Sequence, residues 1–153
     1  IGVRNKRGSC PLNCSHPKPG DIGYNTMRMW QGRSAYSNLH GIVSPAYTIC
    51  KPKNNVDSKF ASYLFQLPRI INLFYRFSQG LVSDTWSLKF YNFSKIKISF
   101  PPISEQKKIS ELLSTLDSEI EKYQKKIEIL KKQKKGLMQI LLIGTIRVNK
   151  LKE

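Results

Sequence analysis

The feature that constrains this chain most is a hydrophobic stripe in its last third. Apolar side chains recur at alternating spacings of three and four residues over ten consecutive positions, and only Lys134 interrupts them. The positions are Ile109, Leu113, Leu116, Ile120, Tyr123, Ile127, Leu130, Lys134, Leu137 and Leu141. A repeat that averages about 3.5 residues keeps one seam on one face of an α-helix and lets it wind around a second helix. The sequence therefore predicts a coiled-coil helix whose function involves a partner helix.

Local signals give this helix its expected ends. Ser104 is suited to cap the first turn, Glu105 complements the helix dipole there, and Gly144 should stop the helix after about Ile143. In heptad notation Ile109, Leu116, Tyr123, Leu130 and Leu137 are d positions, and Leu113, Ile120, Ile127, Lys134 and Leu141 are a positions. A lysine at an a position should lower stability while it fixes register or partner. An ordinary core helix is the alternative, and the many lysines are best explained as a solvated face with Glu121–Lys125 and Glu128–Lys132 pairs.

The charge of the chain favours a polyanionic partner. Its 153 residues carry a formal net charge of +16, and residues 1–103 hold 14 basic residues against three acids. Nucleic acid is the commonest polyanion for such a domain, and no lipidation signal or membrane-length apolar run points to a membrane. Cys10, Cys14 and Cys50 are an odd number without disulfide-like density, which predicts a cytoplasmic protein. The start at Ile1 suggests a fragment or a processed chain.

The segments before the long helix alternate between strand and helix signals. We expect loop over residues 1–20, short strands at 22–24, 27–30, 41–44 and 46–50, and a helix capped by Asp57 that restarts at Pro68. Residues 78–86 should form a loop, and the alternating residues 95–100 a last strand that Pro101 ends. The expected fold class is α+β, with a small mixed domain followed by one long helix.

One segment combines the side chains that read base edges. Arg28 suits guanine, Gln31 suits adenine, and Trp30 offers a ring for sugar or base contact, with Arg33 close behind. A surface strand with Trp30 in the core is the equally balanced alternative, and the positive charge favours DNA or RNA. A zinc site at Cys10, Cys14 and His16, a nuclease site at Asp21 and Asp57, and a methyltransferase loop at Phe100–Ile103 each lack required partners. We therefore expect no catalytic residue, no metal and no cofactor.

Two groups of longer motifs carry a family resemblance. The first group is residues 101–109 (PPISEQKKI), Leu116-Asp117 with Ile120, and residues 137–147. The second group lies upstream, at residues 20–22, 28–32 and 41–47, with Ser78 and Gly80. The first group resembles the conserved helical region of the specificity subunits of type I restriction-modification enzymes, and the second resembles the second half of their target recognition domain. On this basis we expect a loop or truncated remnant at 1–19, a partial recognition domain at 20–103, the conserved coiled-coil helix at 104–147 and a tail at 148–153.

The resemblance implies a non-catalytic reader of double-stranded DNA. Its helix would pair antiparallel with a second such helix, from a missing half of the subunit or from another copy, and would support modification subunits and, through them, restriction subunits. The methyl donor, ATP and magnesium would belong to those partners. Candidate DNA contacts, chosen by chemistry, are Arg28, Trp30, Gln31, Arg33, Gln79 and Ser83. Two rival functions stay open: a homodimeric coiled-coil scaffold, and a general RNA-binding module that prefers single strands.

Overall fold

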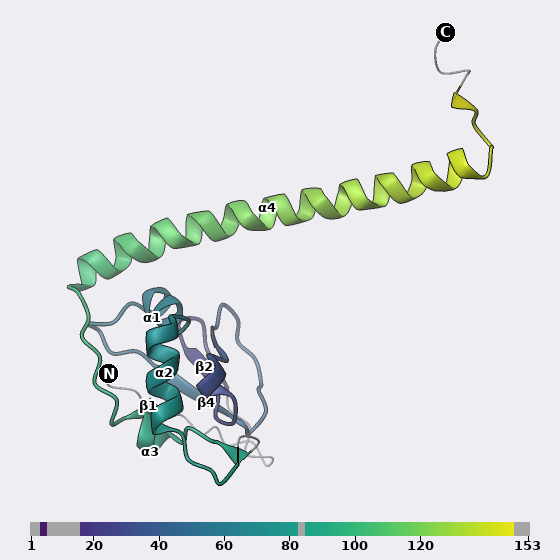
Figure 1. Ribbon diagram of the computed structural model, residues 1–153. Helices are drawn as coiled ribbons and strands as arrows, with labels where there is room; N and C mark the ends of the chain where they lie inside the picture. Colours follow the sequence, from purple (N-terminus) through teal and green to yellow (C-terminus); the bar gives the residue numbers. More distant parts are fainter. Residues whose placement is uncertain (1–3, 6–15, 83–84, 149–153) are drawn as a thin grey trace. The chain divides into compact units, whose positions relative to one another are not determined.

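The computed structural model describes residues 4–5, 16–82 and 85–148 (Figure 1). The chain divides into two compact units, Ile1–Ser110 and Glu111–Glu153. The elements are, in order, β1 (Arg4–Asn5), β2 (Ile22–Asn25), the 3₁₀ turn η1 (Met29–Gln31), β3 (Ser34–Tyr36), β4 (Tyr47–Lys51), α1 (Ser58–Leu64), α2 (Pro68–Phe77), α3 (Phe90–Phe93) and α4 (Ile103–Leu142). This mixture confirms the expected α+β class.

The strands of the first unit form one antiparallel sheet in the order β1-β4-β2-β3. In its centre Ile22 pairs with Cys50 and Tyr24 pairs with Thr48. Because side chains two residues apart share a face of a strand, these four lie on one face, and all four are buried. The sheet therefore presents a continuous inner surface to the helices.

Aromatic rings fill the space between the helices and the sheet. Phe65, Phe74 and Phe93 pack with ring centroids 5.3 to 5.9 Å apart, and Phe93 stacks on Tyr24 at 5.0 Å. The helices begin where the sequence predicts. Asp57 caps α1, its Oδ1 accepting a hydrogen bond from the Phe60 amide at 2.8 Å, and α2 restarts at Pro68. Both helices are thereby held over this aromatic core.

The long helix α4 has 40 residues, which corresponds to about 60 Å. It begins at Ile103, and the amides of Glu105 and Gln106 both donate to the Pro102 carbonyl, so the expected cap at Ser104 is wrong. The predicted stop is confirmed, because the helix ends at Leu142 and Gly144 has a left-handed backbone with φ +80°.

Three predicted strands are wrong. Residues 27–30 enter the 3₁₀ turn η1, residues 41–44 form no named strand, and residues 95–100 are extended but make no strand pairing. In this last segment Ile96 is buried while Lys95 and Lys97 are exposed. The alternation of apolar and polar residues here thus marks an extended segment that lies along the core but lacks the hydrogen-bond ladder of a strand.

Candidate nucleic-acid interface

The segment that carries Arg28 and Gln31 is a tight turn fixed by its own backbone. The Arg28 amide donates to the Asn25 carbonyl at 3.1 Å, and the Met27 amide donates to the Asn25 side chain at 3.0 Å. Side chains three residues apart on a 3₁₀ turn project in the same direction. Arg28 and Gln31 are therefore expected to share one side of the turn, which a strand would not allow.

Gly32 ends this turn and packs closely against α2. Its backbone is left-handed with φ +77°, and a Cβ there would lie 2.7 Å from the Ile71 Cδ1 atom. The Gln66 side chain donates to the Gly32 carbonyl at 3.1 Å. The turn thus packs against α2, and the exposed Arg33 follows it in the chain.

A trio of aromatic rings joins this turn to a second loop. Trp30 meets Trp86 edge to face at 5.3 Å, and Trp86 meets Tyr75 of α2 at 4.8 Å. The Trp30 Nε1 group donates to the Met27 carbonyl at 2.9 Å, and the Leu88 amide donates to the Thr26 carbonyl at 2.7 Å. The trio Trp30–Trp86–Tyr75 therefore holds two segments distant in sequence side by side.

The second loop is closed at its base. Gln79 and Ser87 exchange two backbone hydrogen bonds of 2.8 and 3.1 Å. A Cβ on Gly80 would lie 2.7 Å from the backbone of Thr85 and Trp86, so only glycine allows this close approach. The Gln79 side chain at the base of this loop is exposed, whereas Ser83 lies outside the described residues.

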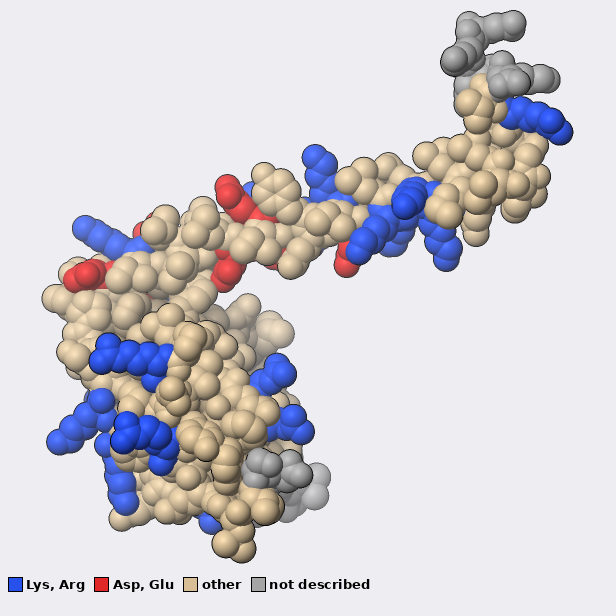
Figure 2. Space-filling view, in the orientation of Figure 1, with Lys and Arg blue, Asp and Glu red and all other residues tan. Residues whose placement is uncertain are grey.

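Carboxylates are scarce in the described part of the first unit. Residues 16–82 and 85–103 contain two carboxylates, and both are engaged in the fold. Asp21 is only 6% exposed and accepts a hydrogen bond from the Lys18 amide, while Asp57 caps α1. Figure 2 shows lysine and arginine side chains on the visible face of this part of the chain. An approaching polyanion therefore meets cations without competing exposed carboxylates among these residues.

The predicted DNA-contact residues differ in how exposed their side chains are. Arg28, Gln31, Arg33 and Gln79 are exposed, as a contact residue must be. Trp30 is half-buried, with its ring packed on Trp86 and its N–H already donated. Tyr75 and Trp86 were missed by the sequence analysis, because nothing local to either residue signals that they meet.

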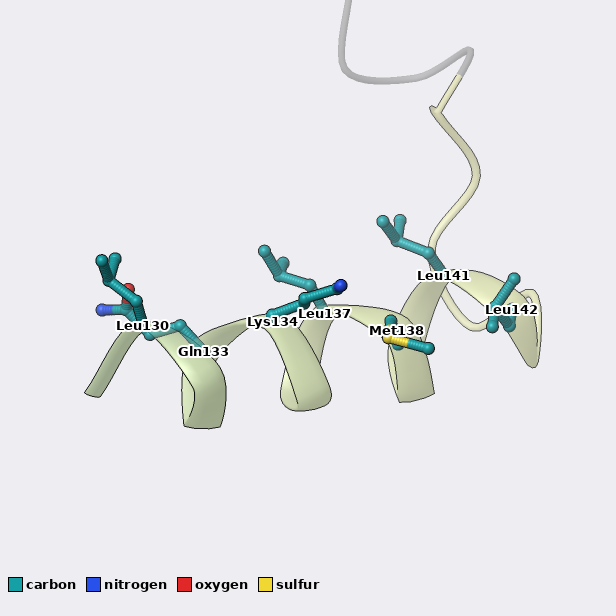
Figure 3. Close-up of a pocket in the computed structure, with 7 residues that line it drawn as sticks. All are labelled: Leu130, Gln133, Lys134, Leu137, Met138, Leu141 and Leu142. Atoms are coloured by element: carbon teal, nitrogen blue, oxygen red, sulfur yellow. The ribbon is translucent and has the colours of Figure 1, made fainter. Parts of the chain in front are cut away.

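Most of the predicted seam of α4 is exposed to solvent. From Leu116 to Leu141 its apolar members are 37 to 66% exposed, whereas Ile109 and Leu113 are partly covered. Near the end of the helix Leu130, Leu137 and Leu141 project from the same side (Figure 3). With Gln133, Lys134, Met138 and Leu142 they line an apolar groove of about 540 Å³. Such an exposed apolar stripe is consistent with a coiled-coil helix.

The Gln106 side chain, which the sequence analysis did not single out, holds the first turn of α4. It is 1% exposed, accepts from the Asp57 amide at 2.9 Å and donates to the carbonyls of Asn55 and Pro101 at 3.1 and 2.8 Å. One buried amide thus joins α4 to the turn before α1 and to the proline linker. In the sequence, the only sign of this role is that a glutamine occupies a position of the helix that faces the domain.

The alternative sites gain no support. Cys10 and Cys14 lie outside the described residues, and within the described part no three His, Cys, Asp or Glu residues gather as a metal site would need. Cys50 is buried, and burial together with the nearby Asp21 carboxylate raises the pKa of its thiol. No helix in the described ranges is long and apolar enough to cross a membrane.

Comparison with known proteins points to one family. Residues 24–131 match the family described as type I restriction modification DNA specificity domain. The chain is 33% identical over 116 residues to the type I restriction enzyme MjaVIII specificity subunit of Methanocaldococcus jannaschii, covering 74% of this chain and 27% of that protein. It is 34% identical over 89 residues to the putative type I restriction enzyme MjaX specificity subunit of the same organism, covering 58% of this chain and 21% of that protein. The chain thus spans about a quarter of the length of these relatives.

Proposed function

Since this chain belongs to the family of type I restriction-modification DNA specificity domains, we propose that its first unit reads a sequence in double-stranded DNA. One observation carries the proposal: two loops joined by aromatic contacts expose Arg28, Gln31, Arg33 and Gln79, while the described carboxylates of this unit before α4 are buried or engaged. Cations supply affinity for the phosphate backbone, and arginine and glutamine side chains supply discrimination between bases.

The proposed contacts have different roles. Arg28 or Gln31 reads a base edge, because both share one side of an exposed turn, and Arg33 binds a phosphate. Gln79 approaches from the second loop. Trp30 positions these loops and does not stack on a base, because its ring already packs on Trp86. Ser83 stays a candidate on its chemistry alone.

The helix α4 supplies the second part of the proposed function. Its exposed seam pairs with a partner helix and forms a platform for modification subunits, which in turn engage restriction subunits. The chain itself is non-catalytic and acts in the cytoplasm, and the methyl donor, ATP and magnesium bind to the partners. A DNA reader joined to a helical platform directs methylation and restriction by other subunits to a chosen sequence.

Binding measurements on the full chain, alone and with its modification partner, test this proposal. We expect binding to duplex DNA that weakens steeply as salt rises, because each neutralised phosphate releases counterions. We also expect saturable preference for one duplex sequence over others. A salt-independent signal, or no binding even with the modification partner, would remove the electrostatic argument. Preference for single-stranded RNA would favour the RNA-binding rival, and equal affinity for all duplexes would favour the scaffold.

A further inference from the structure

The second loop, which connects α2 to α3, carries two exposed apolar side chains in a row. Leu81 is fully exposed and Val82 is 59% exposed. Single exposed apolar residues are common on protein surfaces and need no explanation. These two, however, are the only consecutive exposed large apolar residues in the described part of the chain before α4. We call Leu81 and Val82 the loop tip.

Hydrogen bonds and close packing constrain the loop tip. The Thr85 amide donates to the Val82 carbonyl at 2.9 Å, and the Thr85 hydroxyl donates to the same carbonyl at 2.8 Å. That hydroxyl also accepts from the Val82 amide at 3.2 Å. On the other side of Leu81, Gly80 packs against the backbone of Thr85 and Trp86. The fold thus constrains the backbone on both sides of Leu81 while leaving its side chain uncovered.

The composition of this loop does not suit a phosphate contact. Residues 78–87 contain one aspartate and no lysine or arginine, so a phosphate group would find no cationic partner in this segment. In the major groove of DNA, base edges present hydrogen-bond donors and acceptors, and thymine adds an apolar group, its C5 methyl. Apolar side chains recognise thymine through that methyl group. The chemistry of the loop tip therefore matches a thymine edge.

The neighbours of the loop tip are the residues proposed to read DNA. Gln79 is exposed and precedes Leu81 by two residues, so their Cα atoms lie at most about 7 Å apart, roughly two base-pair steps. Glutamine suits adenine, which is the pairing partner of thymine. At the base of the loop the Leu88 amide donates to the Thr26 carbonyl at 2.7 Å, two residues before Arg28. The loop thus begins beside the turn that carries Arg28.

We propose that Leu81 contacts the C5 methyl group of a thymine in the major groove and is a specificity-determining residue of this chain. The proposal rests on the proposed DNA recognition by the first unit. Such a contact favours thymine over cytosine, which carries no methyl group at C5, and together with Gln79 it makes this loop select A·T pairs.

Replacing thymine by uracil tests the contact, because uracil forms the same base pair but lacks the methyl group. The full chain with its modification partner first selects a duplex from a random-sequence library, and each thymine of that duplex is then replaced in turn. At one thymine we expect the affinity to fall roughly fourfold, which corresponds to the burial of about one methyl-sized group. Leu81→Ala should lower the affinity for the thymine duplex by at least about fourfold and should bind thymine and uracil duplexes equally, because the contact is then absent from both.

Leu39→Ala is the matched control, because it shortens a leucine that is 76% exposed in the segment between β3 and β4. It should keep the fourfold preference for thymine, and thermal unfolding checks that both variants fold. If Leu81→Ala lowers the affinity for thymine and uracil duplexes by the same factor, the side chain contacts another part of the DNA and the proposal is overturned. A selected duplex in which no thymine methyl group affects affinity would also overturn it, while the proposed DNA recognition would stand. A chain that selects no duplex at all would overturn both.

Discussion

At the scale of single residues, Arg28 and Arg33 flank the same turn in different backbone settings. Arg28 precedes η1, whereas Arg33 follows Gly32, whose left-handed backbone ends the turn. Loss of a bidentate arginine–guanine contact costs roughly 1 to 3 kcal/mol and relaxes specificity at one position, whereas loss of a phosphate contact weakens all sequences together. We therefore expect Arg28→Ala to change which sites are methylated and Arg33→Ala to lower affinity uniformly.

Methylation-site profiling of the assembled complex, together with DNA titration, separates these two outcomes. Gln31→Ala should resemble Arg28→Ala if that side of the turn reads bases. Lys97→Ala, which removes an exposed cation from the extended segment before α4, serves as the control. If all three substitutions at the turn leave affinity and methylation pattern intact, the turn is scaffold and the reading surface lies elsewhere.

Tyr24 provides a second test at this scale, within the core. Its hydroxyl is buried near the Thr48 side chain but makes no hydrogen bond within the described part of the chain, and burial raises the pKa of this phenol. Because an unsatisfied buried hydroxyl costs free energy, Tyr24→Phe should leave the free energy of unfolding unchanged or raise it by up to about 1 kcal/mol. Urea unfolding measures this, with the exposed Tyr91→Phe as control. A clear loss of stability would mean that the hydroxyl has a partner in the native protein.

At the scale of elements, the Gln106 side chain makes three hydrogen bonds that join the first turns of α4 to the rest of the first unit. Gln106→Leu keeps the volume of the residue but leaves the Asp57 amide and the carbonyls of Asn55 and Pro101 without their partner. We expect the first unit to lose about 2 to 4 kcal/mol of stability, because groups left unsatisfied in the interior are costly. Tryptophan fluorescence during unfolding reports this unit alone, since both tryptophans, Trp30 and Trp86, lie in it.

The outward-facing Gln139→Leu is the matched substitution on the same helix and should leave the fluorescence transition where it is. Gln106→Glu adds a finer comparison, because it keeps an acceptor for the Asp57 amide but replaces the donor to the two carbonyls. A stability for Gln106→Leu equal to that of the unchanged chain would show that the first turn of α4 is held by packing instead.

The elements also differ in how far the sequence predicts them. The helix α4 follows from its own repeat, and α1 and α2 follow from Asp57 and Pro68, because these signals act within a few residues. The 3₁₀ turn at Met29–Gln31 is not predicted, since the close packing of Gly32 against Ile71 of α2 exists only in the folded chain. The exposed Arg28, Gln31 and Gln79 were found from side-chain chemistry, whereas Trp86 and Tyr75 meet Trp30 only through the tertiary fold. Local chemistry thus predicts the candidate reading residues, and the long-range contacts that align them require the structure.

At the scale of the whole molecule, the source of the partner helix has a consequence for the DNA that is read. Two copies related by a two-fold axis carry identical recognition units, and a two-fold symmetric reader selects a target with matching symmetry. If the partner helix belongs to another copy, duplexes selected from a random-sequence library by the full chain should contain the same half-site twice, in inverted orientation and at fixed spacing. Leu130→Asp, which places a charge in the seam of α4 without touching the reading loops, should enrich single half-sites without fixed spacing, while Glu111→Lys, which changes an exposed residue outside the seam, should behave like the unchanged chain. Selection of two different half-sites would mean that the second reading unit is not a copy of the first, and would contradict the symmetric arrangement even if α4 forms a coiled coil.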